Sequence, residues 1–178
     1  MYEHVIAKFG MEMNALYLLR HAKAETQGAG DDRERKLAEA GRKGAKAIAA
    51  AMAEARIAPE LVLCSGAVRT RQTLEIVLPA LKPAPQIVYE DELYLADAKH
   101  LLARLRHVPK VTRSVMLVGH NPGLVELAVQ LSDRPTGPLM AQLAQGLPTS
   151  ALASFNLPLP WPEIEIGSAH LRALFVLK

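Results

Sequence analysis

The sequence predicts a three-layer α/β domain in which a mainly parallel β-sheet lies between two layers of helices. Short apolar runs of strand length alternate along the chain with longer segments of helical composition. The runs are apolar at nearly every position, as expected for strands that helices cover on both faces. The four clearest runs are residues 15–19, 61–64, 115–118 and 171–177.

Helical segments separate these runs. The first segment is rich in alanine, lysine and glutamate, and its apolar residues recur near helical spacing. The second stops near Pro79 and Pro83. Before the last one, Asn121 is a suitable capping residue and Pro122 suits the first helical position. The expected helices are residues 37–55, 68–81, 98–108 and 122–131.

Two weaker strand candidates and one irregular segment complete the pattern. Residues 86–89 are a short strand candidate, and residues 151–157 are expected to form a strand nearer an edge of the sheet. Residues 132–150 contain several prolines and glycines. We therefore expect an irregular surface loop there, with one helical turn around residues 139–143, and interpret it as a candidate lid.

The chain is expected to form one domain. Its 178 residues match the size of a single domain, and half of them are apolar, which is enough to fill one core. Residues 1–13 carry charged side chains and lack the apolar region of a signal peptide, so we interpret them as an N-terminal extension of a domain at 14–178. No apolar stretch approaches the ~18 residues of a membrane span.

The composition argues against several classes of function. The 21 lysines and arginines exceed the 18 acidic residues by only +3, without the dense basic stripe of a nucleic-acid-binding protein. The single cysteine, Cys64, excludes an intramolecular disulfide and a multi-cysteine zinc site, and it suits a reducing compartment. We therefore expect a cytoplasmic protein without nucleic-acid or membrane partners.

The polar residues that follow the apolar runs indicate a site. Three of the runs end in cationic or polar side chains. Because ligands bind beyond the carboxyl ends of the strands in an open α/β sheet, these side chains should converge on one crevice. They are Arg20 and His21 after the first run, Ser65 with Arg69 and Arg71 after the second, and His120 with Asn121 after the third.

Two histidines and several arginines around one crevice suit a phosphoryl group. A neutral imidazole can attack phosphorus and carry the group covalently, and guanidinium groups can hold its oxygens by bidentate hydrogen bonds. A second, protonated histidine can neutralise the charge that builds up during transfer. Arginines would supply the positive charge that magnesium supplies elsewhere, and no carboxylate cluster indicates magnesium. We therefore expect neither a metal nor a cofactor.

Three motifs at these positions resemble the histidine phosphatase superfamily. The compact size and the stretch from Asp32 to Gly41, with the pattern Asp-Arg-x-Arg-x-Leu-x-x-x-Gly, are similar to the SixA-type phosphohistidine phosphatases. The resemblance covers the chain from about Ala15 to the C-terminal strand, and it implies a phosphoglycerate-mutase-like fold. The three motifs are Leu18-Leu19-Arg20-His21-Ala22, the stretch from Ser65 to Thr73, and Gly119-His120-Asn121-Pro122-Gly123.

The resemblance also implies roles for individual residues. His21 would be the phosphorylated nucleophile, and Arg20, Arg69 and His120 would form the rest of the phosphate pocket. Arg69 matches the motif by its spacing, whereas Arg71 is expected to be a solvated helix residue.

Further residues are candidates for substrate binding. Ser65 and Asn121 would line the pocket or orient its side chains. Arg35 lies in the loop after the first strand, where a basic rim could meet an acidic partner, although solvation alone explains it equally well. Larger superfamily members use a carboxylate from the middle of the chain as general acid, and SixA-like members lack an obvious equivalent. Glu92 and Asp97 are the nearest candidates here.

The expected function is therefore a metal-independent phosphatase that works through a phosphohistidine enzyme intermediate. Phosphohistidine on proteins is the preferred substrate class, because phosphoimidazole is a good leaving group and needs a strong acid less than a serine phosphate does. Two alternatives stay open: a small-molecule phosphatase of the same superfamily, acting on a metabolite or nucleotide, and a non-catalytic phosphate-binding module.

Overall fold

The computed structural model describes residues 13–26, 28, 30–134 and 136–177. The expected N-terminal extension lies outside the described residues except for Met13, and the first strand begins at the next residue, Asn14. Within the described part of the chain, no helix has both the length and the apolar character needed to cross a membrane.

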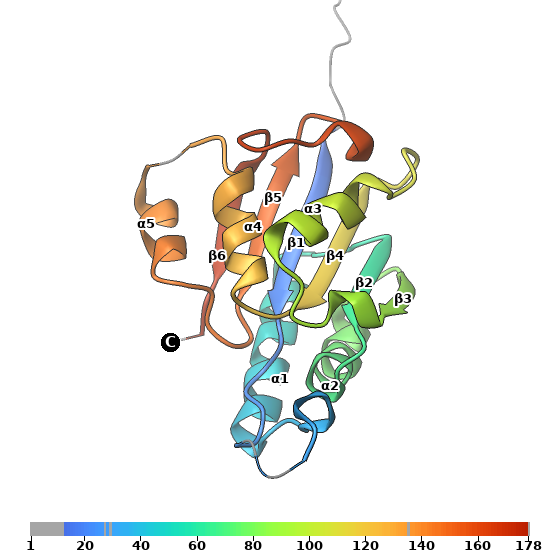
Figure 1. Ribbon diagram of the computed structural model, residues 1–178, viewed down its shortest axis with the longest axis vertical. Coiled ribbons are helices and arrows are strands. Elements are labelled where there is room, and N and C mark those ends of the chain that lie inside the picture. Colours follow the sequence, from blue (N-terminus) through green and yellow to red (C-terminus); the bar gives the residue numbers. More distant parts are fainter. Residues whose placement is uncertain (1–12, 27, 29, 135, 178) are drawn as a thin grey trace, which may run out of the picture.

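A six-stranded mixed sheet forms the middle layer of the molecule, with the strand order β3-β2-β4-β1-β5-β6 (Figure 1). Strands β1 to β4 pair in parallel, whereas β5 runs antiparallel to both β1 and β6. The strands are β1 (Asn14–Arg20), β2 (Leu61–Ser65), β3 (Gln86–Glu90), β4 (Ser114–Gly119), β5 (Leu152–Leu157) and β6 (His170–Phe175).

Helices cover both faces of this sheet, which confirms the three-layer α/β prediction. Helices α1 and α2 pack on one face, and α3, α4 and α5 pack on the other. Figure 1 shows α3 and α4 crossing the near side of the strands. The helices are α1 (Glu39–Glu54), α2 (Val68–Val77), α3 (Ala98–Arg106), α4 (Gly123–Leu131) and α5 (Pro138–Ala144), and the short 3₁₀ turns are η1 (Asp32–Glu34), η2 (Leu78–Ala80), η3 (Asp91–Leu93) and η4 (Trp161–Glu163).

Strand β4 explains why the apolar runs are continuous. Val115 and Leu117 pack into the core beneath α3 and α4, whereas Met116 and Val118 pack into the core beneath α1 and α2. Successive side chains of a strand point to opposite faces, so a strand buried on both faces needs an apolar residue at every position.

The C-terminal part of the sheet differs from the prediction. The run at 171–177 was expected to be a buried strand, but β6 is the edge strand, and each of its side chains is exposed or half-buried. The 151–157 strand lies one position in from that edge, because β5 pairs with β1 on one side and with β6 on the other. An apolar run alone does not distinguish an edge strand from its neighbour.

Two further local predictions were wrong. The segment at 132–150 contains the seven-residue helix α5 instead of a single helical turn, because Met140 and Leu143 are buried against the core. The Asn121 side chain does not cap α4, which begins at Gly123. Its amide instead donates a hydrogen bond to the carbonyl of Leu147, 3.0 Å away.

Candidate active site

The carboxyl ends of β1, β4 and β2 lie side by side, because these strands are parallel neighbours in the sheet. The register aligns Arg20 with Gly119, and the next residue, His21, donates its backbone N–H to the Gly119 carbonyl at 3.1 Å. The rings of His21 and His120 then lie 5.2 Å apart between centroids. Ser65, at the end of β2, places its hydroxyl 2.8 Å from Nε2 of His120.

A pocket of about 570 Å³ opens at this edge of the sheet. A second pocket, of about 380 Å³, lies between the α4–α5 connection and β6 and contains none of the expected site residues. The residues that line the first pocket are Arg20, His21, Lys23, Ala24, Asp32, Arg35, Arg69, Tyr94, Leu95, His120, Asn121 and Thr149.

His21 is oriented for nucleophilic attack. Its Nδ1 lies 2.7 Å from the carbonyl oxygen of Ala22, which can only accept a hydrogen bond, so the ring proton resides on Nδ1. Nε2 therefore carries the lone pair. Arg69 donates its Nε–H to this nitrogen at 3.3 Å, so the nucleophilic atom and a guanidinium group are adjacent before any substrate binds.

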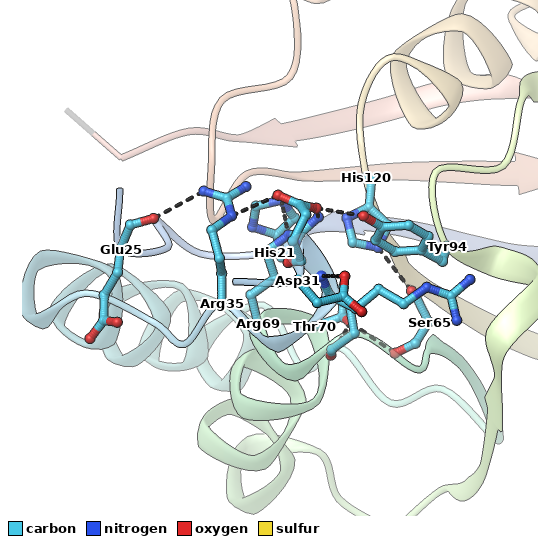
Figure 2. A network of polar contacts seen from close by, with 12 residues as sticks. His21, Glu25, Asp31, Arg35, Ser65, Arg69, Thr70, Tyr94 and His120 are labelled. Atoms are coloured by element: carbon cyan, nitrogen blue, oxygen red, sulfur yellow. Dashed lines mark hydrogen bonds and ion pairs between the residues drawn. The ribbon is translucent and has the colours of Figure 1, made fainter. Parts of the chain in front are cut away.

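Arg69 is held in the first turn of α2 with only 2% of its surface exposed. Its Nη1 donates to the Asp32 carbonyl at 2.6 Å, and its Nη2 donates to the Asp32 carboxylate at 2.8 Å. The Figure 2 close-up shows Arg69, His21, His120 and Tyr94 gathered in one network, although they come from separate parts of the chain.

Two buried nitrogen atoms of the pocket lack hydrogen-bond partners within the described part of the chain. Arg20 donates from Nη1 to the Leu147 carbonyl at 2.8 Å, but its buried Nε–H is unpaired. The Nδ1 atom of His120 is also buried and unpaired. When the Ser65 hydroxyl donates to Nε2 of His120, Nδ1 carries the proton. An unpaired buried polar atom is costly, so the unpaired Nε–H of Arg20 and Nδ1 of His120 beside one nucleophile indicate a site built for a polar ligand.

The electrostatics of the pocket keep both histidines neutral. Burial, together with the positive charges of Arg69, Arg20 and Arg35, lowers the pKa of His21 from 6.5 to about 4. Burial and the neighbouring His21 lower the pKa of His120 to about 3. A protonated second histidine was expected during transfer, and that expectation stays a prediction, because these pKa values describe the free site. His120 faces substrate as a neutral imidazole.

Comparison with known proteins agrees with this geometry. Residues 16–94 match the family model of the histidine phosphatase superfamily, branch 1. The chain is 34% identical to the protein assigned as phosphohistidine phosphatase SixA in Agrobacterium tumefaciens, with a TM-score of 0.78 and coverage of 92% of this chain and 98% of that one. The chain belongs to the histidine phosphatase superfamily. It is therefore a phosphatase, a hydrolase that acts on a phosphorylated substrate.

Two more relatives of this histidine phosphatase cover most of the chain. The protein assigned as SixA in Nakamurella multipartitia is 27% identical, with a TM-score of 0.80 and coverage of 92% of this chain and 96% of that one. The uncharacterized protein ML1117 of Mycobacterium leprae is 31% identical over 163 residues, which are 89% of this chain and 99% of that protein.

The structure brings together the expected site residues except the two acid candidates. His21, Arg20, Arg69 and His120 surround the pocket, with Asn121 and Arg35 at its wall and Ser65 behind His120. Glu92 is exposed on the η3 turn and does not line the pocket. The other acid candidate, Asp97, instead accepts the backbone N–H of His100 and caps α3.

Sequence reasoning missed Asp32 and Tyr94. The Asp32 carboxylate accepts hydrogen bonds from the Tyr94 hydroxyl at 2.5 Å and from Arg35 Nε at 2.7 Å, in addition to those from Arg69. A signal was present, because Asp32 opens the stretch that ends at Gly41. The same stretch contains Arg35, a predicted substrate-binding residue, but no role was predicted for Asp32.

Proposed function

We propose that this histidine phosphatase removes phosphate from phosphohistidine side chains of proteins, by transfer to His21 and then to water. The observation that carries the proposal is the placement of the free Nε2 of His21 beside the cationic Arg69 and two unpaired buried nitrogen atoms, on Arg20 and His120. The naming of the SixA relatives as phosphohistidine phosphatases supports this substrate class.

In the first step, Nε2 of His21 attacks phosphorus, and the bond between phosphorus and the substrate nitrogen breaks. The leaving imidazole keeps the electron pair of that bond and departs neutral when its other ring nitrogen carries a proton. In the second step, a water oxygen bonds to phosphorus, and the bond to Nε2 breaks. Inorganic phosphate leaves, and His21 recovers its lone pair. Arg20, Arg69 and His120 hold the phosphoryl oxygens throughout.

The carboxylate in the pocket favours such a leaving group. Among the described residues that line the pocket, Asp32 is the only carboxylate. The hydrogen bond from Tyr94, with those from Arg69 and Arg35, lowers its pKa from 3.8 to about 2. It is therefore ionised at neutral pH and is a poor proton donor. A phosphoimidazole can leave without such a donor, whereas an alkyl phosphate cannot leave easily.

The alternative substrate is a small phosphorylated molecule. The pocket volume of about 570 Å³ falls within the usual range for small-molecule sites, so size alone admits a phosphorylated metabolite or nucleotide.

A substrate panel tests the proposal. The purified protein is assayed with excess chelator on a phosphohistidine protein, an aryl phosphate, and alkyl phosphates such as phosphoserine and a sugar phosphate. We expect hydrolysis of the first two substrates to survive chelation and to be much faster than that of the alkyl phosphates. Robust hydrolysis of the alkyl phosphates would favour the small-molecule alternative. Phosphate binding without turnover would indicate a binding module.

The covalent step can be tested separately. Rapid quenching in alkali should trap an acid-labile phosphoramidate on His21, and His21→Ala should abolish both trapping and turnover. His107→Ala is the matched control, because His107 is exposed at the end of α3 and its ring Nδ1 lies 2.7 Å from the Ala103 carbonyl oxygen of the same helix. Label on His120, or label that survives in His21→Ala, would contradict the assignment of the nucleophile.

A further inference from the structure

The loop between β1 and α1 holds Asp32 against the pocket. Ala24 and Leu37 form an isolated bridge across the base of this loop. Arg35 donates to the Glu25 carbonyl at 2.9 Å, as Figure 2 shows. The Asp31 side chain accepts a backbone N–H at the start of η1. These contacts fix the loop from both of its arms, so Asp32 does not depend on substrate for its position.

Asp32 engages the terminal nitrogens of Arg69 with two acceptors at once. Nη1 donates to the Asp32 carbonyl oxygen at 2.6 Å and Nη2 donates to its carboxylate at 2.8 Å. A guanidinium group is planar, so two hydrogen bonds at its terminal nitrogens define the orientation of the whole group. The remaining nitrogen, Nε, then faces Nε2 of His21 at 3.3 Å.

We propose that Asp32 is a positioning residue, which fixes the guanidinium plane of Arg69 so that its Nε edge faces the phosphoryl group at His21. The inference rests on the role proposed above for Arg69 and His21. Among the described residues, Asp32 supplies both acceptors that the terminal nitrogens of Arg69 bond to. A donor that is already oriented needs no reorganisation at the transition state, which is why such positioning increases the rate.

Two further contacts hold the carboxylate itself. The Tyr94 hydroxyl donates to Oδ2 at 2.5 Å, and Arg35 Nε donates to Oδ1 at 2.7 Å. The Tyr94 ring also lies edge-on to the ring of His120, with centroids 5.4 Å apart. The Asp32 carboxylate thus links the loop to Arg69 and, through Tyr94, to His120.

The same contacts argue against Asp32 as the general acid. A proton donor needs a carboxyl oxygen that carries hydrogen. Here, however, Oδ1 accepts from a guanidinium group, and Oδ2 accepts from both a guanidinium group and a phenol. All three partners are donors, so they stabilise the ionised carboxylate. Asp32 therefore acts through Arg69, and a double-mutant cycle can separate the two roles.

The experiment compares Asp32→Asn with Asp31→Asn, each made in the wild-type and in the Arg69→Ala background. Asparagine retains the size of the side chain and, at position 31, its capping ability. We expect Asp32→Asn to lower kcat for an aryl phosphate by ~10–100-fold, the range found when a residue that orients a ligand is replaced, with a smaller change in KM. Asp31→Asn should differ from the wild type by less than about twofold, because its contact is local to the η1 turn.

The cycle decides between the two roles. If Asp32 acts through Arg69, Asp32→Asn has no further effect in the Arg69→Ala background, and its effect is the same for aryl phosphates of high and low leaving-group pKa. Multiplicative losses, or a loss that grows with leaving-group pKa, would overturn the inference and indicate a proton donor. Equal activity of Asp32→Asn and Asp31→Asn would also overturn it. If Arg69→Ala itself keeps full activity, the role proposed for Arg69 in phosphate binding is wrong, whatever the result for Asp32. Circular dichroism confirms that each variant is folded.

Discussion

Replacement of Arg69 provides the sharpest test of the site, because α2 carries a matched control two residues away. Arg69 and Arg71 are both in the first turn of α2, but they differ in their surroundings. Arg69 is 2% exposed and contacts His21 and Asp32. Arg71 is exposed and stacks over the ring of Tyr89 at 5.3 Å. Arg69→Ala therefore removes an arginine side chain from the pocket, and Arg71→Ala removes one from the surface.

The structure sets the expected magnitudes. Loss of one preorganised donor to a developing charge costs a factor of about 10²–10³ in kcat, or about 2.7–4 kcal/mol. Arg69→Ala also leaves the Asp32 carboxylate without its buried partner. Breaking a buried ion pair costs about 3–5 kcal/mol of stability. The lower end applies here, because Asp32 is 23% exposed and keeps Arg35. Arg71→Ala removes a cation–π contact of roughly 0.5–1 kcal/mol and no contact with the pocket.

The assay is steady-state hydrolysis of an aryl phosphate, with thermal unfolding measured on the same samples. Arg69→Ala should lose at least ~10² in kcat/KM and unfold at a lower temperature, yet stay folded at 25 °C, because a domain of this size is stable by about 5–15 kcal/mol. Arg69→Lys keeps the positive charge but lacks the planar guanidinium group with its several donors, and it serves as a second variant. Arg71→Ala should retain nearly full activity. Equal losses at the two positions, in folded proteins, would refute the placement of the phosphate site.

Two other predictions concern protonation and packing. Because burial and three guanidinium groups lower the pKa of His21 to about 4, the ring stays neutral as pH falls from 8 to 5 and gains its proton, losing its lone pair, only near pH 4. The ¹⁵N NMR shifts of the imidazole should show this, and a midpoint near 6.5 would contradict it. Gly41→Ala should destabilise the protein by about 1–3 kcal/mol, because the new Cβ would lie 1.9 Å from the Lys23 carbonyl oxygen. Gly44→Ala, on the same helix, meets only the rotatable Ser150 hydroxyl at its closest contact, so thermal unfolding should show a clearly smaller loss.

The layered fold and the centre of the site could be predicted because both depend on local patterns. Continuous apolar runs identified the strands β1, β2 and β4, and parallel pairing places the residues that follow them at one edge. His21 and His120 each come directly after a strand, so their positions follow from the strand ends alone. No long-range information was needed beyond the strand order.

The remaining site residues depend on long-range contacts, which a local pattern alone does not place. Asp32 reaches Arg69 across 37 positions of sequence and Tyr94 across 62. Glu92 is only two residues from Tyr94, yet it is exposed on the η3 turn while Tyr94 lines the pocket. Asn121 was expected to cap α4, but the Leu147 carbonyl, which returns with the loop after α5, accepts its amide hydrogen. Each of these outcomes depends on where a distant loop packs.

The stretch from Asp32 to Gly41 shows how spacing in a motif can follow from such packing. Asp32 contacts Arg69, and Arg35 contacts both Asp32 and the opposite arm of the loop. The Leu37 side chain is buried, and its backbone N–H donates a hydrogen bond to Oε1 of Gln72 on α2 at 2.8 Å. At Gly41, α1 passes so close to the Lys23 carbonyl, two residues after His21, that a side chain would not fit. Four of the five fixed positions of the motif thus anchor the loop at different places. A one-residue change in its length would displace Asp32 from Arg69 while leaving His21 in place.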